Sequence, residues 1–121
     1  MKFGFMTNVL VKNGMKTLPE IASWAVSHGF SDLEVGPTVP LDQRISEEVM
    51  ENTGIRISTL TYCRNFLSHQ EEERETHRKE LVRRIHLAGE LGIEKVVTST
   101  GIDKSVEEGV YDKADSIRKI P

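Results

Sequence analysis

The stretch HLAGELGIEKVVTSTG, residues 86–101, decides the fold class of this chain. It contains the end of a long helix at Leu91, a glycine stop at Gly92 and a strand-like run over about 94–100. A helix that leads directly into a strand is the repeating unit of α/β proteins. We therefore expect a parallel sheet in which this run is the fourth strand.

Three further strand-like segments precede it, at about 2–9, 31–36 and 55–62. Both parities of the first segment are largely apolar, which is typical of a strand buried on two sides. Helix-like segments lie between the strands. One opens at a capping box of Thr17 and Glu20 and ends at Gly29, and a weak one covers about 45–52.

The long helix opens at a second capping box, Ser68 to Glu71, and runs to Leu91. Its predicted apolar stripe consists of Leu81, Ile85, Ala88 and Leu91, supported by Val82. The charged run from Glu71 to Arg84 is interpreted as a solvated helix face. A further helix start is possible at Ser105.

Strand–helix alternation of this kind implies parallel strands joined by right-handed crossovers. Two folds satisfy it: an open flavodoxin-like sheet, or a portion of a closed (β/α)8 barrel of ~250 residues. We expect the second, an α/β fold in which residues 1–121 form one N-terminal (βα)4 half-barrel domain that breaks off within its fourth helix.

Composition excludes several classes of function. The net charge is −3, which does not favour binding to nucleic acid or to a membrane surface. No apolar run approaches the ~20 residues of a membrane span, and the first residues do not resemble a signal peptide. The single cysteine excludes an internal disulfide and fits a reducing, cytoplasmic location.

Ligands of parallel α/β proteins bind where strands end at their carboxyl edge. Hydroxyl, amide and charged side chains are abundant at these positions and suit hydrogen bonding to a polyol or sugar. The candidate substrate-binding residues are Thr7, Asn8, Glu34, Tyr62, Arg64, Asn65 and Thr100.

Glu34 is the sharpest candidate, because a carboxylate between Leu33 and Val35 points to the opposite face from both. There it could orient hydroxyls, bind a divalent ion or act as a base. It could also simply pair with Arg64 or Lys95, or be solvated at a sheet edge. Arg64 could hold a phosphate or carboxylate, although a solvated loop arginine is the simpler interpretation. Asn65 could instead cap the turn after its strand.

Other reactive residue types give weaker signals. Cys63 is interpreted as a buried structural thiol, because no histidine–acid pair is arranged to activate it. Of the four histidines only His69 is placed near a strand end, so we expect no metal site from this chain alone.

Four stretches together resemble the sugar phosphate isomerase/epimerase family, which has a xylose isomerase-like TIM barrel and is related to endonuclease IV. They are KFGFMT (2–7), LPEIASWAVSHGFSDLEVGP (18–37), GIRISTLTYCRNFLS (54–68) and HLAGELGIEKVVTSTG (86–101). The resemblance implies a divalent metal (Mn, Mg, Co or Zn) held by strands five to eight, and it makes Glu34 and Asn65 substrate-side residues. The catalytic residues stay unassigned.

Two functional hypotheses follow. The chain is the substrate-facing half of a sugar or sugar phosphate isomerase/epimerase, inactive by itself. Alternatively, it is a non-catalytic half-barrel module that forms a homo-oligomer or complements a partner chain through its open sheet edges. A flavodoxin-like binding domain is the third option, although no glycine-rich phosphate loop follows the first strand.

Overall fold

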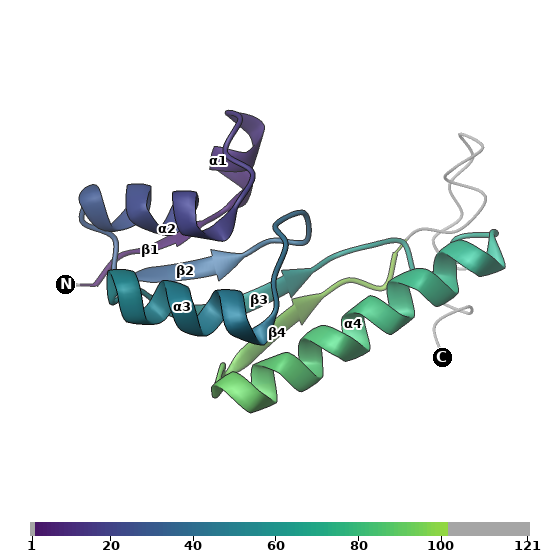
Figure 1. Cartoon of the computed structure of the whole chain (residues 1–121). Helices are drawn as coiled ribbons and strands as arrows, with labels where there is room; N and C mark the ends of the chain where they lie inside the picture. Colours follow the sequence, from purple (N-terminus) through teal and green to yellow (C-terminus); the bar gives the residue numbers. More distant parts are fainter. Residues whose placement is uncertain (1, 102–121) are drawn as a thin grey trace.

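The computed structural model describes residues 2–101, which form a four-stranded parallel sheet with helices between the strands (Figure 1). The strands are β1 (Gly4–Met6), β2 (Asp32–Val35), β3 (Arg56–Tyr62) and β4 (Lys95–Thr98). The helices are α1 (Asn8–Lys12), α2 (Leu18–Ser27), α3 (Gln43–Thr53) and α4 (Glu71–Leu91). The predicted parallel α/β architecture is confirmed. The possible helix start at Ser105 lies outside the described residues.

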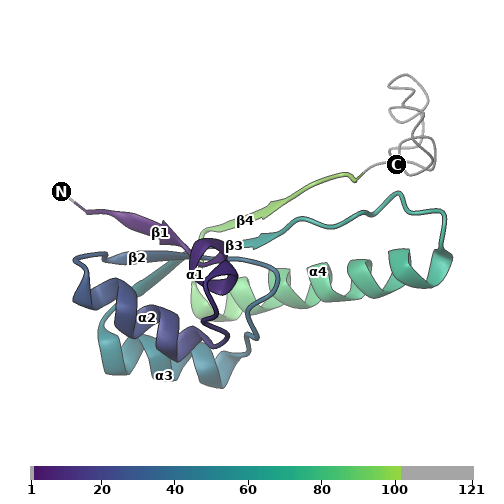
Figure 2. The ribbon, with the colours of Figure 1, turned by 90° about the horizontal axis from the view of Figure 1, so that it is seen from above.

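The strands lie side by side in chain order, β1-β2-β3-β4, and α2, α3 and α4 all lie on one side of them (Figure 2). Right-handed crossovers that always move in the same direction place every helix on the same face of a sheet. A doubly wound sheet of the flavodoxin type instead reverses its strand order so that helices cover both faces. The described strands contain no such reversal.

The hydrophobic core lies between this helix face and the three helices. Leu33 and Val35 of β2 and Leu60 of β3 have no exposed surface, and Ile21 of α2 and Leu87 of α4 pack into the same cluster. Each such side chain contributes about 1.5–3 kcal/mol when it is removed from water. The helix face therefore supplies most of the hydrophobic stabilisation of the described residues.

The opposite surface of the sheet is here called the Glu34 face. Register places Met6, Glu34, Thr59 and Lys95 in one row across the four strands. Thr61 and Val97 form the next step toward the carboxyl ends of β3 and β4. Within residues 2–101 no helix packs on this face, which is the more polar of the two.

Side-chain caps fix where α2 and α3 begin. The Thr17 hydroxyl accepts a hydrogen bond from the Glu20 amide at 3.4 Å, as its capping box predicts. Asp42, which the sequence analysis missed, does the same for the Ile45 amide at 2.7 Å and starts α3 two residues earlier than expected.

The capping box predicted at Ser68 is not formed, because α4 begins at Glu71 after Gln70 with no side-chain cap, and the Ser68 hydroxyl instead donates to Glu73 at 2.7 Å. Gly54 and Gly92 end α3 and α4 in the left-handed conformation that glycine adopts most easily.

The first strand is shorter than predicted. The strand expected over about 2–9 stops at Met6, and Asn8–Lys12 form a helical turn instead. The Thr7 carbonyl accepts hydrogen bonds from the amides of Leu10 and Val11, both at 3.1 Å. The strand preference of Val9 and Val11 is overridden by tertiary context, because Thr7 is held by its bonds to the Glu34 carbonyl and the Gly36 amide where the helical turn starts.

A bulge in β3 also escaped the sequence analysis. Leu33 pairs with Ile57 and Glu34 pairs with Thr59, so Ser58 is the extra residue, and its hydroxyl donates to the Leu33 carbonyl at 3.2 Å. A bulge reverses the alternation of side chains beyond it. Ile57 and Leu60 both face the helices for this reason, although their spacing predicts opposite faces.

The buried face of α4 differs from the predicted stripe. Arg84, Leu87 and Ala88 are buried, whereas Val82 is 40% and Ile85 50% exposed. The helix is rotated so that an arginine, and not a leucine, occupies the centre of its inner face. Interpreting every charge of the run from Glu71 to Arg84 as solvated was therefore wrong. None of the helices within residues 2–101 combines the length and apolar character that crossing a bilayer requires.

Candidate functional site

The carboxyl ends of β1 and β2 are joined through Thr7. Its backbone amide donates to the Glu34 carbonyl at 3.0 Å, and its hydroxyl accepts from the Gly36 amide at 2.9 Å. The residue is fully buried. Thr7, a predicted substrate-binding residue, therefore has its hydroxyl committed to holding two strand ends together.

Asn8 lies directly beside this junction. Its Oδ1 atom is buried and has no hydrogen-bond partner. A Cβ atom placed on Gly36 would lie only 2.0 Å from that oxygen, so any side chain at position 36 would force the Asn8 amide to move. A buried acceptor without a partner is uncommon in folded proteins, where nearly all are satisfied, and Asn8 therefore remains a candidate for ligand contact.

Glu34 is half-buried on the Glu34 face, as its position between Leu33 and Val35 predicts. Its carboxylate accepts a hydrogen bond of 2.5 Å from the Thr61 hydroxyl on the neighbouring strand. The carboxylate thus has a neutral partner and not the arginine or lysine that the simplest alternative required. One oxygen is oriented by Thr61, and the charge is free to accept hydrogen bonds from ligand hydroxyls.

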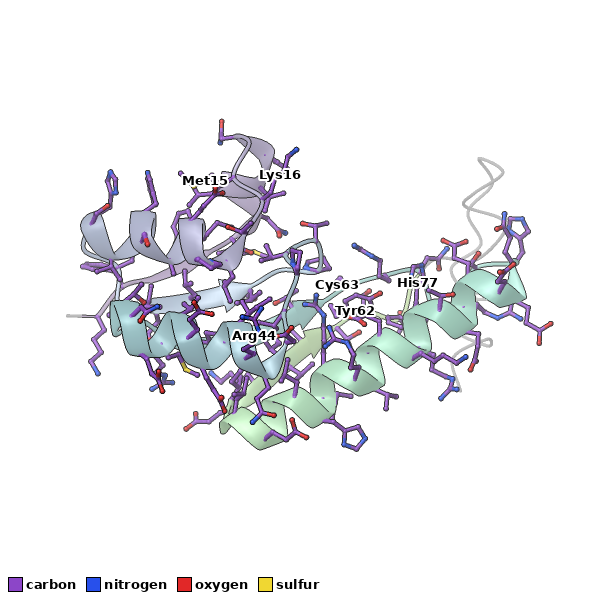
Figure 3. All side chains as sticks on the ribbon, viewed as in Figure 1. Met15, Lys16, Arg44, Tyr62, Cys63 and His77 are labelled. Carbon is purple, nitrogen blue, oxygen red and sulfur yellow. The ribbon has the colours of Figure 1, made fainter. Side chains whose placement is uncertain are left out.

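Tyr62 lies on the other side of the sheet from Glu34. Its ring is buried on the helix face, 5.1 Å below the Arg84 guanidinium, and its hydroxyl lies 3.5 Å from His77 Nδ1 on α4 (Figure 3). The bulge at Ser58 produces this placement, because it sets Thr61 and Tyr62 on opposite sides from those that simple alternation predicts. The structure therefore does not bring Tyr62 together with Glu34.

Two residues that follow β3 are more accessible. Cys63 is exposed, so its interpretation as a buried structural thiol was wrong. The Arg64 guanidinium lies 5.5 Å from the centre of the Tyr62 ring and donates to the Cys63 carbonyl at 3.2 Å in an exposed hydrogen bond. Neither contact neutralises the charge of Arg64.

The loops after β3 and β4 pack against one another. The Ser99 hydroxyl donates to the Arg64 carbonyl at 3.1 Å, and Gly101 lies so close to Asn65 that no side chain fits there. Asn65 Oδ1 accepts from the Leu67 amide at 3.1 Å, which is the turn-capping role that the sequence left open. Between the loops is a shallow hollow of about 410 Å3, with Thr100 in its lining.

A second hollow, of about 240 Å3, lies between the ends of β1, β2 and β3. Six residues line it: Asn8, Val11, Lys12, Pro37, Thr38 and Arg64. Arg64 also lines the larger hollow, so the two meet at its side chain. The strand ends thus bring Asn8 and Arg64 together, whereas Thr7 is buried beneath them and Tyr62 faces α4.

Arg84 holds the rim of the second hollow in place. Its guanidinium donates to the carbonyls of Gly36 at 3.1 Å, Pro37 at 3.2 Å and Val39 at 3.4 Å, and also to the carboxylate of Glu80 at 3.0 Å. Hydrogen bonds from Arg83 and then Arg84 lower the pKa of Glu80 to about 2. The segment between β2 and α3 therefore has its shape imposed by a charged group on a distant helix.

The sequence analysis missed several residues of this region. Thr61 was not predicted because the bulge hides its shared face with Glu34. Lys12 was not predicted because it lies beyond the strand expected over about 2–9, in a segment that was not expected to be helical. The signal available for Lys12 was the spacing of Asn8 and Lys12, which share one face of a helix. Arg84 carries no such signal, since nothing local separates it from Arg83.

Metal binding gains no support from the described part of the chain. No three side chains of histidine, cysteine, aspartate or glutamate come together as a ligand set within residues 2–101. His69 is exposed in the loop before α4. Residues 2–101 therefore do not fit the divalent ion that the family resemblance implies.

Comparison of this chain with models of protein families, with curated proteins and with solved structures gave no significant match.

Proposed function

We propose that this chain binds a polyhydroxylated carbohydrate at the carboxyl ends of its strands, as the substrate-facing part of an isomerase- or epimerase-type (β/α)8 barrel. The single observation that carries the proposal is the Glu34–Thr61 pair on the face of the sheet that no described helix covers. A carboxylate oriented by a neutral donor accepts hydrogen bonds from vicinal hydroxyls without first having to break an ion pair.

The strand order supports the barrel arrangement. A sheet whose strands follow chain order, with all helices on one side, leaves its other face open unless the sheet curves and closes. In a closed barrel the Glu34 face would line the interior, and Glu34 would lie at the carboxyl end, where barrel ligands bind. Further strands would then supply the groups that react, so this chain is expected to bind sugar without converting it.

A titration of the isotope-labelled chain with ketoses such as fructose and xylulose, followed by 1H–15N NMR, tests the proposal. We expect backbone shifts around Glu34 and Thr61, and a loss of affinity of about tenfold or more in Glu34→Gln, because a hydrogen bond to a charged group is replaced by a neutral one.

Asp32→Asn is the matched control. Asp32 lies on the same strand and the same face, but at the amino end, where it pairs with Arg56 at 3.4 Å. Its substitution should leave sugar binding unchanged. Equal affinity in wild type, Glu34→Gln and Asp32→Asn, or no binding at all, would contradict the proposal.

A second candidate function, assembly with another half-barrel, is favoured by the distribution of exposed apolar residues. Phe3, Val9 and Val26 lie on the β1 side, whereas Val82, Ile85 and Val97 lie on the β4 side. These are the two margins of the described sheet, where a further βα unit would pack on each side. The middle units show no large hydrophobic residue of comparable exposure among residues 2–101.

Light scattering of the chain tests this candidate. Assembly through the margins predicts a mass above that of the monomer, reduced to the monomer mass in Ile85→Glu. A charged change on an already charged surface, Glu48→Lys, should leave the mass unaltered. A monomeric wild type at high concentration would exclude assembly of identical chains.

A further inference from the structure

The turn that follows α1 joins Asn13 to Gly14, and neither candidate function uses it. Both residues are exposed. Gly14 has a left-handed backbone with a φ of 97°, and apart from its chain neighbours no atom lies within 4 Å of the place where its side chain would be. Figure 1 shows α1 above α2, projecting away from α3 and α4. Water and the backbone nitrogen of Gly14 can therefore both approach the side-chain amide of Asn13.

An asparagine that precedes a glycine readily undergoes deamidation, an intramolecular reaction. The backbone nitrogen of the glycine attacks the side-chain carbonyl carbon, and the side-chain nitrogen leaves as ammonia, taking the proton of the attacking amide. Water then opens the cyclic imide at either of its carbonyls, and the product is aspartate or isoaspartate. Glycine favours the attack because it has no Cβ atom to obstruct the approach.

The three other asparagines of the chain have larger neighbours. Valine follows Asn8, threonine follows Asn52 and phenylalanine follows Asn65. In addition, Asn8 Oδ1 is buried, and Asn65 Oδ1 accepts a hydrogen bond from the Leu67 amide at 3.1 Å. Asn13 is therefore the asparagine that combines a glycine neighbour with an exposed side chain.

Hydrogen bonds to α1 hold this turn in a form that does not react. The Gly14 amide donates to the Val11 carbonyl at 3.1 Å, and Asn13 Nδ2 donates to the Val9 carbonyl at 2.8 Å. The attacking nitrogen and the leaving group are thus both bound to the helix. The reaction requires α1 to unwind at this end. A helix of five residues that buries only Leu10 opens at a low cost in free energy.

We propose that Asn13 is a site of spontaneous deamidation and that unwinding of α1 controls its rate. The product places a carboxylate at the carboxyl end of α1, where the helix dipole is already negative, and isoaspartate also adds a carbon atom to the main chain. Both changes favour the unwound form. Because Asn8, Val11 and Lys12 of α1 line the second hollow, modification of Asn13 alters the wall of that hollow.

Incubation of the chain at mildly alkaline pH, followed by peptide mass spectrometry with fragmentation that distinguishes aspartate from isoaspartate, tests the site. We expect modification of Asn13 to be at least about tenfold faster than that of Asn52, because glycine leaves the attack unobstructed and a β-branched threonine does not. Equal rates at Asn13 and Asn52, or an unmodified Asn13, would overturn the site.

Val9→Ala tests the control by α1. Alanine has the higher helix propensity, so α1 should open less often and deamidation of Asn13 should slow by about two- to threefold. Val26→Ala is the matched control, because Val26 is also an exposed valine but belongs to α2, and its rate should equal that of wild type. Equal rates in all three proteins would overturn the control by α1.

Unfolding of the chain in guanidinium chloride gives a second test of this control. The reaction should accelerate at Asn13, because the rate of a reaction through an opened state follows the population of that state. An equal rate in the folded and unfolded chain would show that the bonds to Val9 and Val11 do not protect the site.

The effect on α1 is measured with Asn13→Asp, which carries the aspartate product and lacks the donor to the Val9 carbonyl. Hydrogen exchange should become faster at the amides of Val11 and Gly14, whose bonds belong to α1 and its turn, and should stay unchanged at the buried Leu33 of β2. Unaltered exchange at Val11 and Gly14 would overturn the proposed change in the wall of the second hollow.

Discussion

The two faces of the sheet differ in the kind of side chain that they carry. On the helix face, Leu33, Val35 and Leu60 are wholly buried against α2, α3 and α4. On the Glu34 face, β2, β3 and β4 present Glu34, Thr59 and Lys95 in a single row. Packing explains the first set fully. It does not explain a hydrogen-bonded carboxylate in the second, and this difference is the reason why the proposed function is assigned to the Glu34 face.

The difference also shows that the helix face is not purely apolar. Arg84 is 2% exposed, yet it lies on the same inner surface of α4 as Leu87 and Ala88. Its bonds to three carbonyls satisfy a segment that has no regular secondary structure. The helix face therefore builds the core and also shapes the loop that borders the second hollow.

Removing Arg84 is expected to have the largest effect. Arg84→Ala should lower the free energy of unfolding by about 3–5 kcal/mol, because buried carbonyls and Glu80 lose their partner. Arg83→Ala, which breaks an exposed pair with the same glutamate, should cost under about 1 kcal/mol. Urea denaturation measures the free energy of unfolding of both variants. Equal losses would show that the bonds from Arg84 to the three carbonyls contribute nothing beyond its ion pair with Glu80.

Two consecutive residues of β3 compare the faces directly. Leu60→Ala should destabilise the protein by about 2–5 kcal/mol through lost burial and a cavity. Thr59→Ala, on the Glu34 face, should change stability by no more than about 0.5 kcal/mol. The same denaturation experiment applies, and a comparable loss at Thr59 would mean that the Glu34 face is packed against another part of the protein.

The contact between Gly36 and Asn8 gives a smaller, coupled effect. Gly36→Ala should cost about 1–3 kcal/mol, because its methyl group would overlap Asn8 Oδ1. Combining it with Asn8→Ala should restore most of that loss. A double-mutant cycle measures the coupling, and simple additivity would show that the strain arises elsewhere.

The smallest effect is a dependence on pH. The pKa of Glu80 is lowered to about 2 from an ordinary value of 4.5, so its contribution to stability is complete above about pH 4.5 and disappears as the pH falls through about 2. Glu80→Gln should remove this component, making the difference from wild type shrink between pH 4.5 and 2. A difference that stays constant over that range would exclude ionised Glu80 as its source.

Much of the fold follows from local patterns in the sequence. Glycine stops and the Thr17 cap predicted where helices end or begin, and β2 and β4 lie within the predicted segments 31–36 and 94–100. These features depend on residues close in the chain. The sheet order follows from them, because right-handed crossovers leave few alternatives.

The features that were not predicted depend on contacts between distant residues. Thr7 ends β1 through its bonds to β2, and Ser58 shifts the phase of β3 by bonding across to Leu33. Nothing local in the sequence distinguishes Arg84 from Arg83. Only Arg84 contacts the segment from Gly36 to Val39, which is distant in the chain. At the candidate site the sequence therefore predicted Glu34 and its face, but not Thr61, Lys12 or the position of Tyr62.

The bonds made by Arg84 also set an order of events. They connect positions 45 to 48 residues apart, so they form only once the chain between them has closed a long loop. The border of the second hollow therefore takes its native shape only once α4 has packed beside it. During synthesis on the ribosome, that border remains unfinished until α4 has emerged from the exit tunnel.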